Sequence, residues 1–231
     1  VPKTMAGPRL IASEPNQHQW LQGLVANQII QRYTNTILSN CISFDNQTHN
    51  GHMALMSSRT GSHATVDLKS ASDRLSCWAV ERFFRANLSL LERIHATRTR
   101  MIINRVDSTV WEQIVLKKCF TQGNALTFPV QSICYAIAAI ASVLITNGKK
   151  VTEKTLEEAS TQVRIFGDDI IVPVDALETL VRILTALQLQ VNYSKTFSKG
   201  KFRESCGVDA YNGVNVTPVF VKTVSTKPRH E

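Results

Sequence analysis

The sequence lacks several features that would place it in common protein classes. Its five cysteines are odd in number and widely separated, with no CxxC pair and no Cys/His spacing typical of a zinc site. They therefore indicate reduced thiols in a cytosolic protein. The longest apolar run, residues 136–145, is too short to span a bilayer, so we expect a buried helix and no membrane role.

The chain also lacks internal repeats, low-complexity segments and a linker rich in Pro, Gly and Ser, so nothing in it indicates two independently folding units. At 231 residues, 43% of them hydrophobic, it can bury a core of its own. It has no signal-peptide features, and neither Val1 nor Glu231 resembles a domain end. We therefore expect a piece of a longer protein.

Acidic residues are fewer than basic ones, 18 against 26, which gives a net charge of +8. An excess of this sign favours a polyanionic partner such as nucleic acid. No basic block stands out, however, so charge alone leaves a merely basic soluble protein as an equal alternative.

Hydrophobic periodicity predicts alternating helices and strands. The expected elements are a helix over 20–37, a polar loop to 61, a strand over 63–68, a helix over 75–88, a strand over 111–120, a turn over 121–124, a helix over 127–146, a hairpin over 163–172, a helix over 176–187 and a strand over 189–193, followed by short strands and turns. This order predicts an α+β domain in which helices pack against one face of an antiparallel sheet.

The expected hairpin carries two adjacent carboxylates, Asp168 and Asp169, at its bend after Gly167. Buried neighbouring carboxylates repel each other and lose solvation, so they persist where a cation compensates them, and a divalent metal with oxygen ligands fits. Because successive strand residues point to opposite faces, one of the two should be the main ligand. Taken alone, Gly-Asp-Asp would be an ordinary solvated turn, but the apolar residues on both sides argue against that.

A third carboxylate, Asp67, ends the short run over 63–68. If that strand lies beside the hairpin, Asp67 and Asp168 can hold two Mg²⁺ ions about 3.5 to 4 Å apart, as phosphoryl-transfer enzymes do. One ion would lower the pKa of a ribose 3′-hydroxyl and the other would neutralise the leaving pyrophosphate. A helix N-cap or turn aspartate is the competing interpretation of Asp67.

Several of these residues carry a family resemblance. Four sites, in order along the chain, resemble motifs A to D of viral RNA-dependent RNA polymerases. Motif A is resembled by Asp67 and Asp73, motif B by Gly123-Asn124 and Thr127-Phe128, motif C by Gly167-Asp168-Asp169, and motif D by Lys195. Within that class, Asp67–Asp73, Gln122–Phe128 and Phe202–Gly207 resemble the replicase β subunit of single-stranded RNA phages, the leviviruses, the last segment as motif E. Residues 1–15 resemble their motif F, so the resemblance covers nearly the whole chain.

The resemblance implies a polymerase palm, with an antiparallel sheet backed by helices, and part of the fingers. Its segments would be a partial fingers segment with motif F over 1–62, the palm with motifs A to E over 63–222, and the truncated start of the following region over 223–231.

The resemblance also implies roles for single residues. Asp67 and Asp168 would bind the metal pair with Asp169 assisting, and Lys195 would protonate the departing pyrophosphate. The remaining implied contacts are those of Lys3 and Arg9 with the triphosphate, Asp73 with the ribose 2′-hydroxyl, Gly123 near the template base, Asn124 with nucleotide or RNA, Thr127 and Gln131 with a ribose, and Arg203 with phosphate at the growing 3′ end. Cys206 is expected to pack.

Ordinary structural roles compete with some of these assignments. Asp73 could cap the following helix as well as contact a ribose. Gln131 could simply be exposed, and many viral polymerases carry Asn there, which leaves sugar recognition open. Lys3 and Arg9 could be solvated cations, and two further lysines, Lys199 and Lys201, compete with Lys195.

The predicted function is two-metal transfer of nucleotides to an RNA 3′ end on an RNA template, with Mg²⁺ as cofactor and Mn²⁺ able to replace it. Asp73 disfavours a reverse transcriptase, because a carboxylate accepts a hydrogen bond only from a sugar that has the hydroxyl. The intact carboxylates disfavour an inactive RNA-binding domain of palm shape. The resemblance further implies template and product RNA, nucleoside triphosphates, host elongation factors Tu and Ts and a small-subunit ribosomal protein as partners, in the cytoplasm of an infected bacterium.

Overall fold

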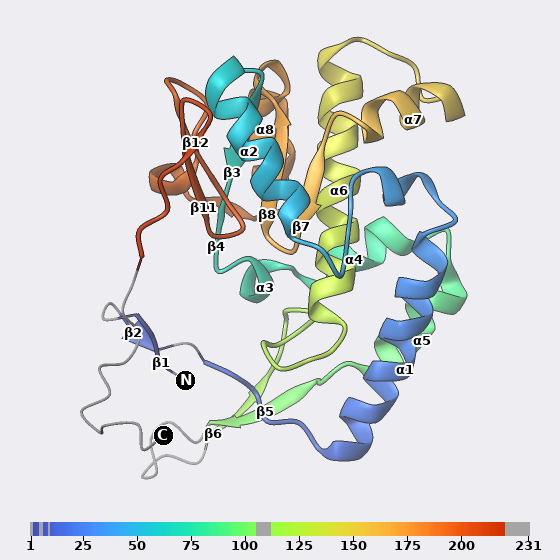
Figure 1. The fold of residues 1–231 in the computed structure, drawn as a ribbon. Coiled ribbons are helices and arrows are strands. Elements are labelled where there is room, and N and C mark those ends of the chain that lie inside the picture. The colour runs from blue at the N-terminus through green and yellow to red at the C-terminus, as the bar shows by residue number, and fades with distance from the viewer. Residues whose placement is uncertain (1, 5–6, 9, 105–111, 220–231) are drawn as a thin grey trace, which may run out of the picture.

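The protein is represented by a computed structural model that describes residues 2–4, 7–8, 10–104 and 112–219. Helices and small antiparallel sheets alternate along it (Figure 1). The elements are β1 (Pro2–Thr4), β2 (Gly7–Pro8), α1 (Asn16–Tyr33), η1 (Ile37–Asn40), α2 (Thr48–Thr60), β3 (His63–Val66), β4 (Leu68–Lys69), α3 (Ala71–Arg74), α4 (Cys77–Phe84), α5 (Leu88–Thr97), β5 (Met101–Asn104), β6 (Glu112–Val115), α6 (Thr127–Thr146), α7 (Glu153–Ser160), β7 (Arg164–Phe166), β8 (Asp169–Pro173), η2 (Val174–Ala176), α8 (Leu177–Ala186), β9 (Gln190–Val191), η3 (Tyr193–Lys195), β10 (Phe202–Ser205), β11 (Val208–Tyr211) and β12 (Val214–Asn215). The predicted mixture of helices and antiparallel strands is confirmed.

The central sheet has the strand order β3-β8-β7, and both of its strand pairs are antiparallel. Its register places Val66 opposite Ile170 and Phe166 opposite Asp169. Consecutive residues of β3 and β8 are buried, which means that both faces of the sheet are covered. Helices α2 and α6 and strand β10 all contact this sheet, so its cover includes a strand as well as helices.

Helix α6 is the centre of the hydrophobic core. It packs against α7, α8 and the central sheet, and Figure 1 shows it running beside β7 from the top of the molecule to below its middle. Its length and composition would suffice to cross a membrane, but 78% of the apolar window lies buried inside the fold. Such burial is typical of the core helix of a globular domain. The predicted bounds of this helix, 127–146, are confirmed.

Helix α2 lies where the sequence predicts a polar loop. Its buried side includes Asn50, Ser57 and Ser58, so the helix has no apolar stripe to detect. Gly51 fits the close approach of β11, because a Cβ atom there would lie 2.8 Å from Cγ2 of Val208. Small and polar residues thus replace an apolar face where a helix packs tightly on a sheet.

Other element bounds also differ from the prediction. Helix α1 begins and ends four residues earlier than expected, and the helix expected over 75–88 is shorter, running as α4 from Cys77 to Phe84, with the separate helix α5 after it. Asn87 explains where α5 begins, since its side-chain oxygen accepts a hydrogen bond from the Leu90 backbone N–H at 3.1 Å and so caps a new helix. The helices α5 and α7 and the strand β5 have no counterpart in the predicted elements.

The segment boundary predicted at residues 62 and 63 stays a prediction. Helix α2 precedes that boundary, yet it packs against β10, β11 and the central sheet, all of which follow it. Residues 220–231, which include the third predicted segment, lie outside the described residues.

Candidate active site

The three predicted carboxylates lie at one end of the central sheet. Asp67 directly follows Val66, the last residue of β3, and Val66 pairs with Ile170, so position 67 falls beside position 169 in register. Asp169 begins β8, and Asp168 precedes it in the turn from β7. The strand pairing on which the sequence argument depended is therefore confirmed.

Gly167 makes this turn possible. It has a φ of 62°, and a Cβ atom on it would lie 3.1 Å from the Phe128 ring. Its backbone N–H donates to Oγ of the buried Ser132 at 3.1 Å. The carboxylate turn is thus fixed against the first two turns of α6, the helix that follows the predicted motif B.

Asn192 holds Asp67 at two points. Its side-chain amide donates to Oδ2 of Asp67 at 2.7 Å, and its backbone N–H donates to the Asp67 carbonyl oxygen at 2.9 Å. Asn192 follows β9, which pairs with β4 directly after Asp67. The sequence argument did not single out Asn192. The only feature of the sequence that could have indicated Asn192 is its position three residues before Lys195.

The carboxylates of this cluster lie in an electrostatically unfavourable environment. Burial, followed by the charge of Asp168, raises the pKa of Asp169 from 3.8 to about 6, whereas hydrogen bonds from Cys206 act in the opposite direction. Burial also raises the pKa of Asp67, an effect that the Asn192 hydrogen bond opposes and the charge of Asp168 reinforces. A bound cation would relieve both effects.

The donor set fits magnesium. All three side chains offer hard carboxylate oxygens, and the nearby cation Lys195 is engaged with Glu204 at 2.9 Å. Among the residues that the structure describes, no group of three or more His, Cys, Asp or Glu side chains is placed so that it could hold a metal ion. Mg²⁺ is commonly bound through one or two carboxylates together with substrate phosphates and water, so a magnesium site here would need those further ligands.

The Asp169→Asn variant should be more stable than the parent in metal-free buffer at pH 7.5. In the parent, Asp169 must lose its proton in a buried site above about pH 6, and an amide avoids this cost of about 3 kcal/mol. Because the folded pKa is raised, the parent's disadvantage is present above pH 6 and disappears below about pH 4. Urea denaturation at both pH values, with chelator present, measures the difference. An equal gain at pH 4 and pH 7.5 would contradict the assigned cause.

Neither Asp67 nor Asp73 caps a helix, so both competing interpretations are wrong. The N-cap of α3 is Ser70, and that of α4 is Ser76, whose side chain accepts from the Ala79 backbone N–H at 3.2 Å. Asp73 lies inside α3, is half-exposed, and forms an ion pair with Lys118. The predicted ribose contact is compatible with that exposure.

The predicted motif B residues build a loop rather than an open surface. Thr127 donates to the Thr121 carbonyl oxygen at 2.8 Å, and both ends of the Asn124 side chain are hydrogen-bonded inside the protein. A Cβ atom on Gly123 would lie 2.4 Å from the Ala12 carbonyl oxygen, so this glycine permits close packing against the N-terminal arm. Their predicted contacts with RNA or nucleotide stay predictions.

Glu14 organises this loop and was not predicted. One of its carboxylate oxygens accepts from Thr121 at 3.1 Å and from Asn124 at 3.3 Å, and the other accepts from Gln22. The side chain is almost fully buried. A buried carboxylate with this many donors connects the N-terminal arm, α1 and the loop before α6.

Gln131 lies beneath the carboxylate turn. Only 6% of it is exposed, and its Nε2 atom would lie 3.4 Å from a Cβ atom on Gly167. The alternative that Gln131 is simply exposed is therefore wrong. Its Oε1 atom is buried without a hydrogen-bond partner in the described part of the chain, and its ribose contact stays a prediction.

Lys195 is distinguished from the two competing lysines by its electrostatic coupling to the carboxylates. Its hydrogen bond to Glu204 raises its pKa most, and the charges of Asp67 and Asp169 raise it further. Lys201 instead donates to the Arg59 carbonyl oxygen at 3.0 Å, and Lys199 is exposed. The structure thus favours Lys195 as the protonated group near the cluster.

The expected phosphate contact of Arg203 is contradicted. Its side chain is fully buried and donates to the backbone carbonyl oxygens of five residues: His63, Ser198, Lys199, Gly200 and Phe202. A guanidinium enclosed in this way cannot reach an RNA phosphate. Side chains alternate along β10, and Arg203 is on its buried side. A strand of only four residues is too short for the sequence pattern to predict which side is buried.

Cys206 does more than pack. Its Sγ atom lies 3.6 Å from Oδ2 of Asp169 and donates a hydrogen bond to it. Burial raises the pKa of the thiol to about 12, so the thiol stays protonated.

Two predicted triphosphate contacts cannot be placed: the side chain of Lys3 and the whole of Arg9 lie outside the described residues.

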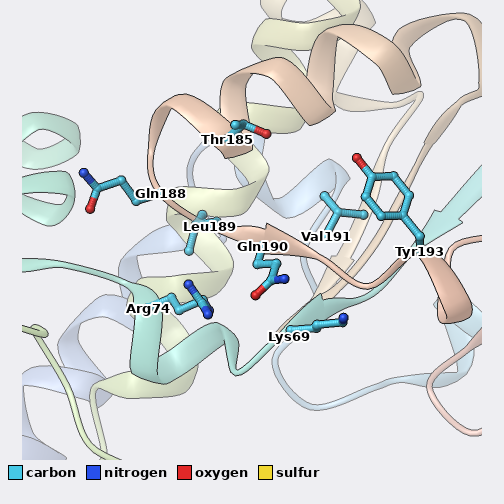
Figure 2. A pocket seen from close by; sticks show the side chains of 8 residues that line it. All are labelled: Lys69, Arg74, Thr185, Gln188, Leu189, Gln190, Val191 and Tyr193. Carbon is cyan, nitrogen blue, oxygen red and sulfur yellow. The ribbon is translucent and has the colours of Figure 1, made fainter.

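A basic pocket adjoins the Asp67 segment (Figure 2). It has a volume of about 310 Å³ and lies between the segment carrying Lys69 and Arg74 and the stretch from the end of α8 to Tyr193. Within the described ranges, neither cation has an ion-pair or hydrogen-bond partner. No carboxylate lines the pocket.

Comparison with known proteins gives consistent matches. Residues 1–229 match the family described as RNA replicase, beta-chain. The chain is 32% identical over 223 residues to the RNA-directed RNA polymerase subunit beta of Qbeta virus (strain MX1), covering 96% of this chain and 34% of that protein. It is 34% identical over 224 residues to the RNA-directed RNA polymerase beta chain of Escherichia phage MS2, covering 96% of this chain and 37% of that protein.

The chain therefore spans about a third of the length of the curated relatives it matches. Among solved structures, the apo telomerase of Candida tropicalis, truncated from the C-terminal domain, resembles it with a TM-score of 0.52 and 14% identity. That alignment covers 87% of this chain and 45% of the telomerase chain. At this identity the likeness shows a shared fold alone.

Proposed function

Because the chain belongs to the RNA replicase beta-chain family, we propose that it carries the catalytic centre of an RNA-directed RNA polymerase of an RNA phage. The observation that carries the proposal is the convergence of Asp67, Asp168 and Asp169 at one end of the central sheet. In this proposal the central sheet with α6 and α8 is the palm, and the N-terminal arm with α1 belongs to the fingers.

Asp67 and Asp168 would hold two Mg²⁺ ions, with Asp169 assisting and Mn²⁺ able to replace them. When bound, the ions activate the 3′-hydroxyl and neutralise the charge that develops on the pyrophosphate. The fit rests on the raised pKa values of Asp67 and Asp169, since buried carboxylates of this kind gain most from a cation.

The other residues of the site would bind and orient the nucleotide. Asp73, half-exposed on α3, accepts a hydrogen bond from the ribose 2′-hydroxyl. Lys195, whose pKa is raised by Glu204 and by the carboxylates, stays protonated and delivers a proton to the pyrophosphate. Asn192 fixes the orientation of Asp67 through its two hydrogen bonds.

The partners in this proposal are template and product RNA and nucleoside triphosphates. By family resemblance we add host elongation factors Tu and Ts and a small-subunit ribosomal protein, with the cytoplasm of an infected bacterium as the place of action. The net charge of +8 supports a polyanionic ligand.

Primer extension by the full-length protein tests the proposal. On an RNA template with magnesium, ribonucleotides should be added about 10 to 100 times more efficiently than 2′-deoxynucleotides, because one hydrogen bond to a charged acceptor is worth about 1.5 to 3 kcal/mol. The measurement is kcat/KM for each nucleotide. Equal use of both sugars, or preference for a DNA template, would instead indicate a polymerase of the reverse transcriptase type.

A further inference from the structure

Asp73 has a charged partner from a distant part of the chain. Lys118, in the segment between β6 and α6, forms an ion pair with Oδ1 of Asp73. The Lys118 side chain is 23% exposed and that of Asp73 is 46% exposed. The pair therefore lies at the surface of the site, and Asp73 still presents part of its carboxylate to solvent.

The backbone around Lys118 is fixed to the link between α3 and α4. The Cys119 backbone N–H donates to the Leu75 carbonyl oxygen at 2.9 Å, and the Cys77 N–H donates to the Lys117 carbonyl oxygen at 3.3 Å. Ser76 and Lys118 form an isolated antiparallel bridge between these bonds. Leu75 and Cys119 are both buried, so the base of the Lys118 side chain is held firmly beside α3.

A second contact ties the same two segments together. The Gln122 side-chain amide donates to Oγ of Ser72 at 3.4 Å, one residue before Asp73. The 118–122 segment thus reaches α3 at two adjacent side chains, Ser72 and Asp73. This gives α3, a helix of only four residues, a defined position relative to α6.

The pairing is selective among the neighbouring cations. Arg74 is next to Asp73 in sequence, yet it lines the basic pocket and has no ion-pair partner in the described part of the chain (Figure 2). Lys117, next to Lys118, is exposed, and its side chain likewise has no partner there. Proximity in sequence therefore does not explain why Lys118 is the cation on Asp73.

We infer that Lys118 is a positioning residue for sugar selection. The ammonium group holds one carboxylate oxygen of Asp73, which restricts the side-chain rotamer and leaves the other oxygen to accept the 2′-hydroxyl of an incoming ribonucleotide. This inference rests on the proposed function, because it assumes that Asp73 reads the sugar. Without Lys118, Asp73 would have to be ordered each time a nucleotide binds.

The test compares Lys118→Met, Lys118→Arg and the neighbouring control Lys117→Met in the full-length protein. Lys118→Met should lower the ratio of kcat/KM for ribonucleotides over 2′-deoxynucleotides about fivefold, the usual upper value for a partly exposed ion pair. The loss should fall on the ribonucleotide alone. Lys118→Arg should restore most of the ratio, and Lys117→Met should leave it unchanged.

A double variant shows whether Lys118 acts through Asp73. Asp73→Ala with Lys118→Met should select sugars no worse than Asp73→Ala alone. The inference is overturned if Asp73→Ala lowers the ratio but Lys118→Met does not, or if Lys118→Met slows both sugars equally, as a structural defect would. Those results leave the proposed function standing. Failure of the parent to extend RNA primers would overturn the proposed function itself.

Discussion

Replacing Asp168 with Asn in the full-length protein should lower the rate of RNA-templated nucleotide addition about a thousandfold. In the proposed site the amide would remove an anionic metal ligand, and metal ions contribute several kcal/mol of charge stabilisation in a transition state, at about 1.4 kcal/mol for each factor of ten. The turn geometry should survive, because Gly167 and its hydrogen bond to Ser132 position the backbone. Single-turnover primer extension at saturating nucleotide measures the chemical step.

Asp175→Asn provides the matched control. Asp175 is an exposed aspartate on η2, directly after β8, and the same substitution there removes one negative charge at the other end of that strand. Its rate should equal that of the parent. If Asp168→Asn adds ribonucleotides as fast as Asp175→Asn does, Asp168 is not a metal ligand.

The Arg203→Met variant should lose about 3 to 5 kcal/mol of unfolding free energy. The side chain is fully buried, and it donates to the His63 and Phe202 carbonyl oxygens, both at 2.6 Å, as well as to three further carbonyls. Methionine has a similar volume but no donor, so these acceptors would be left without their partner. The midpoint of urea denaturation of the full-length protein measures the loss.

Lys199→Met is the control for this variant. It removes the same charge from an exposed side chain, and it leaves intact the Lys199 carbonyl oxygen that Arg203 contacts at 3.4 Å. Its stability should match that of the parent. A phosphate contact, as the sequence alone predicted for Arg203, would give the opposite pattern: unchanged stability, weaker RNA binding and a shallower salt dependence.

Local chemistry made some features predictable. The hairpin over 163–172 and α6 carry strong apolar patterns, and two carboxylates at an apolar bend are unusual enough to indicate a cation site. Alternation of side chains along a strand also predicts that Asp168 and Asp169 have different roles. These inferences need only neighbours in the chain, so the sequence contains all the information for them.

Features that depend on contacts between distant segments were not predictable. Helix α2 buries Asn50, Ser57 and Ser58, so its pattern is that of a loop until β11 is placed beside it. Glu14 meets Asn124 across 110 positions, and Lys118 meets Asp73 across 45. Nothing in the local sequence distinguishes Lys118 from Lys117, or Arg203 from a surface arginine.

The sequence by itself determined which residue types converge, namely three acidic side chains, a lysine and a glycine turn, in the order that is typical of the family. The tertiary structure alone decided their surroundings: the side of β10 on which Arg203 lies, the amide that holds Asp67 and the ammonium group that holds Asp73. The reason is physical, because periodicity and turn chemistry are local properties. Burial, pKa shifts and ion pairing depend on which remote segments the fold brings together.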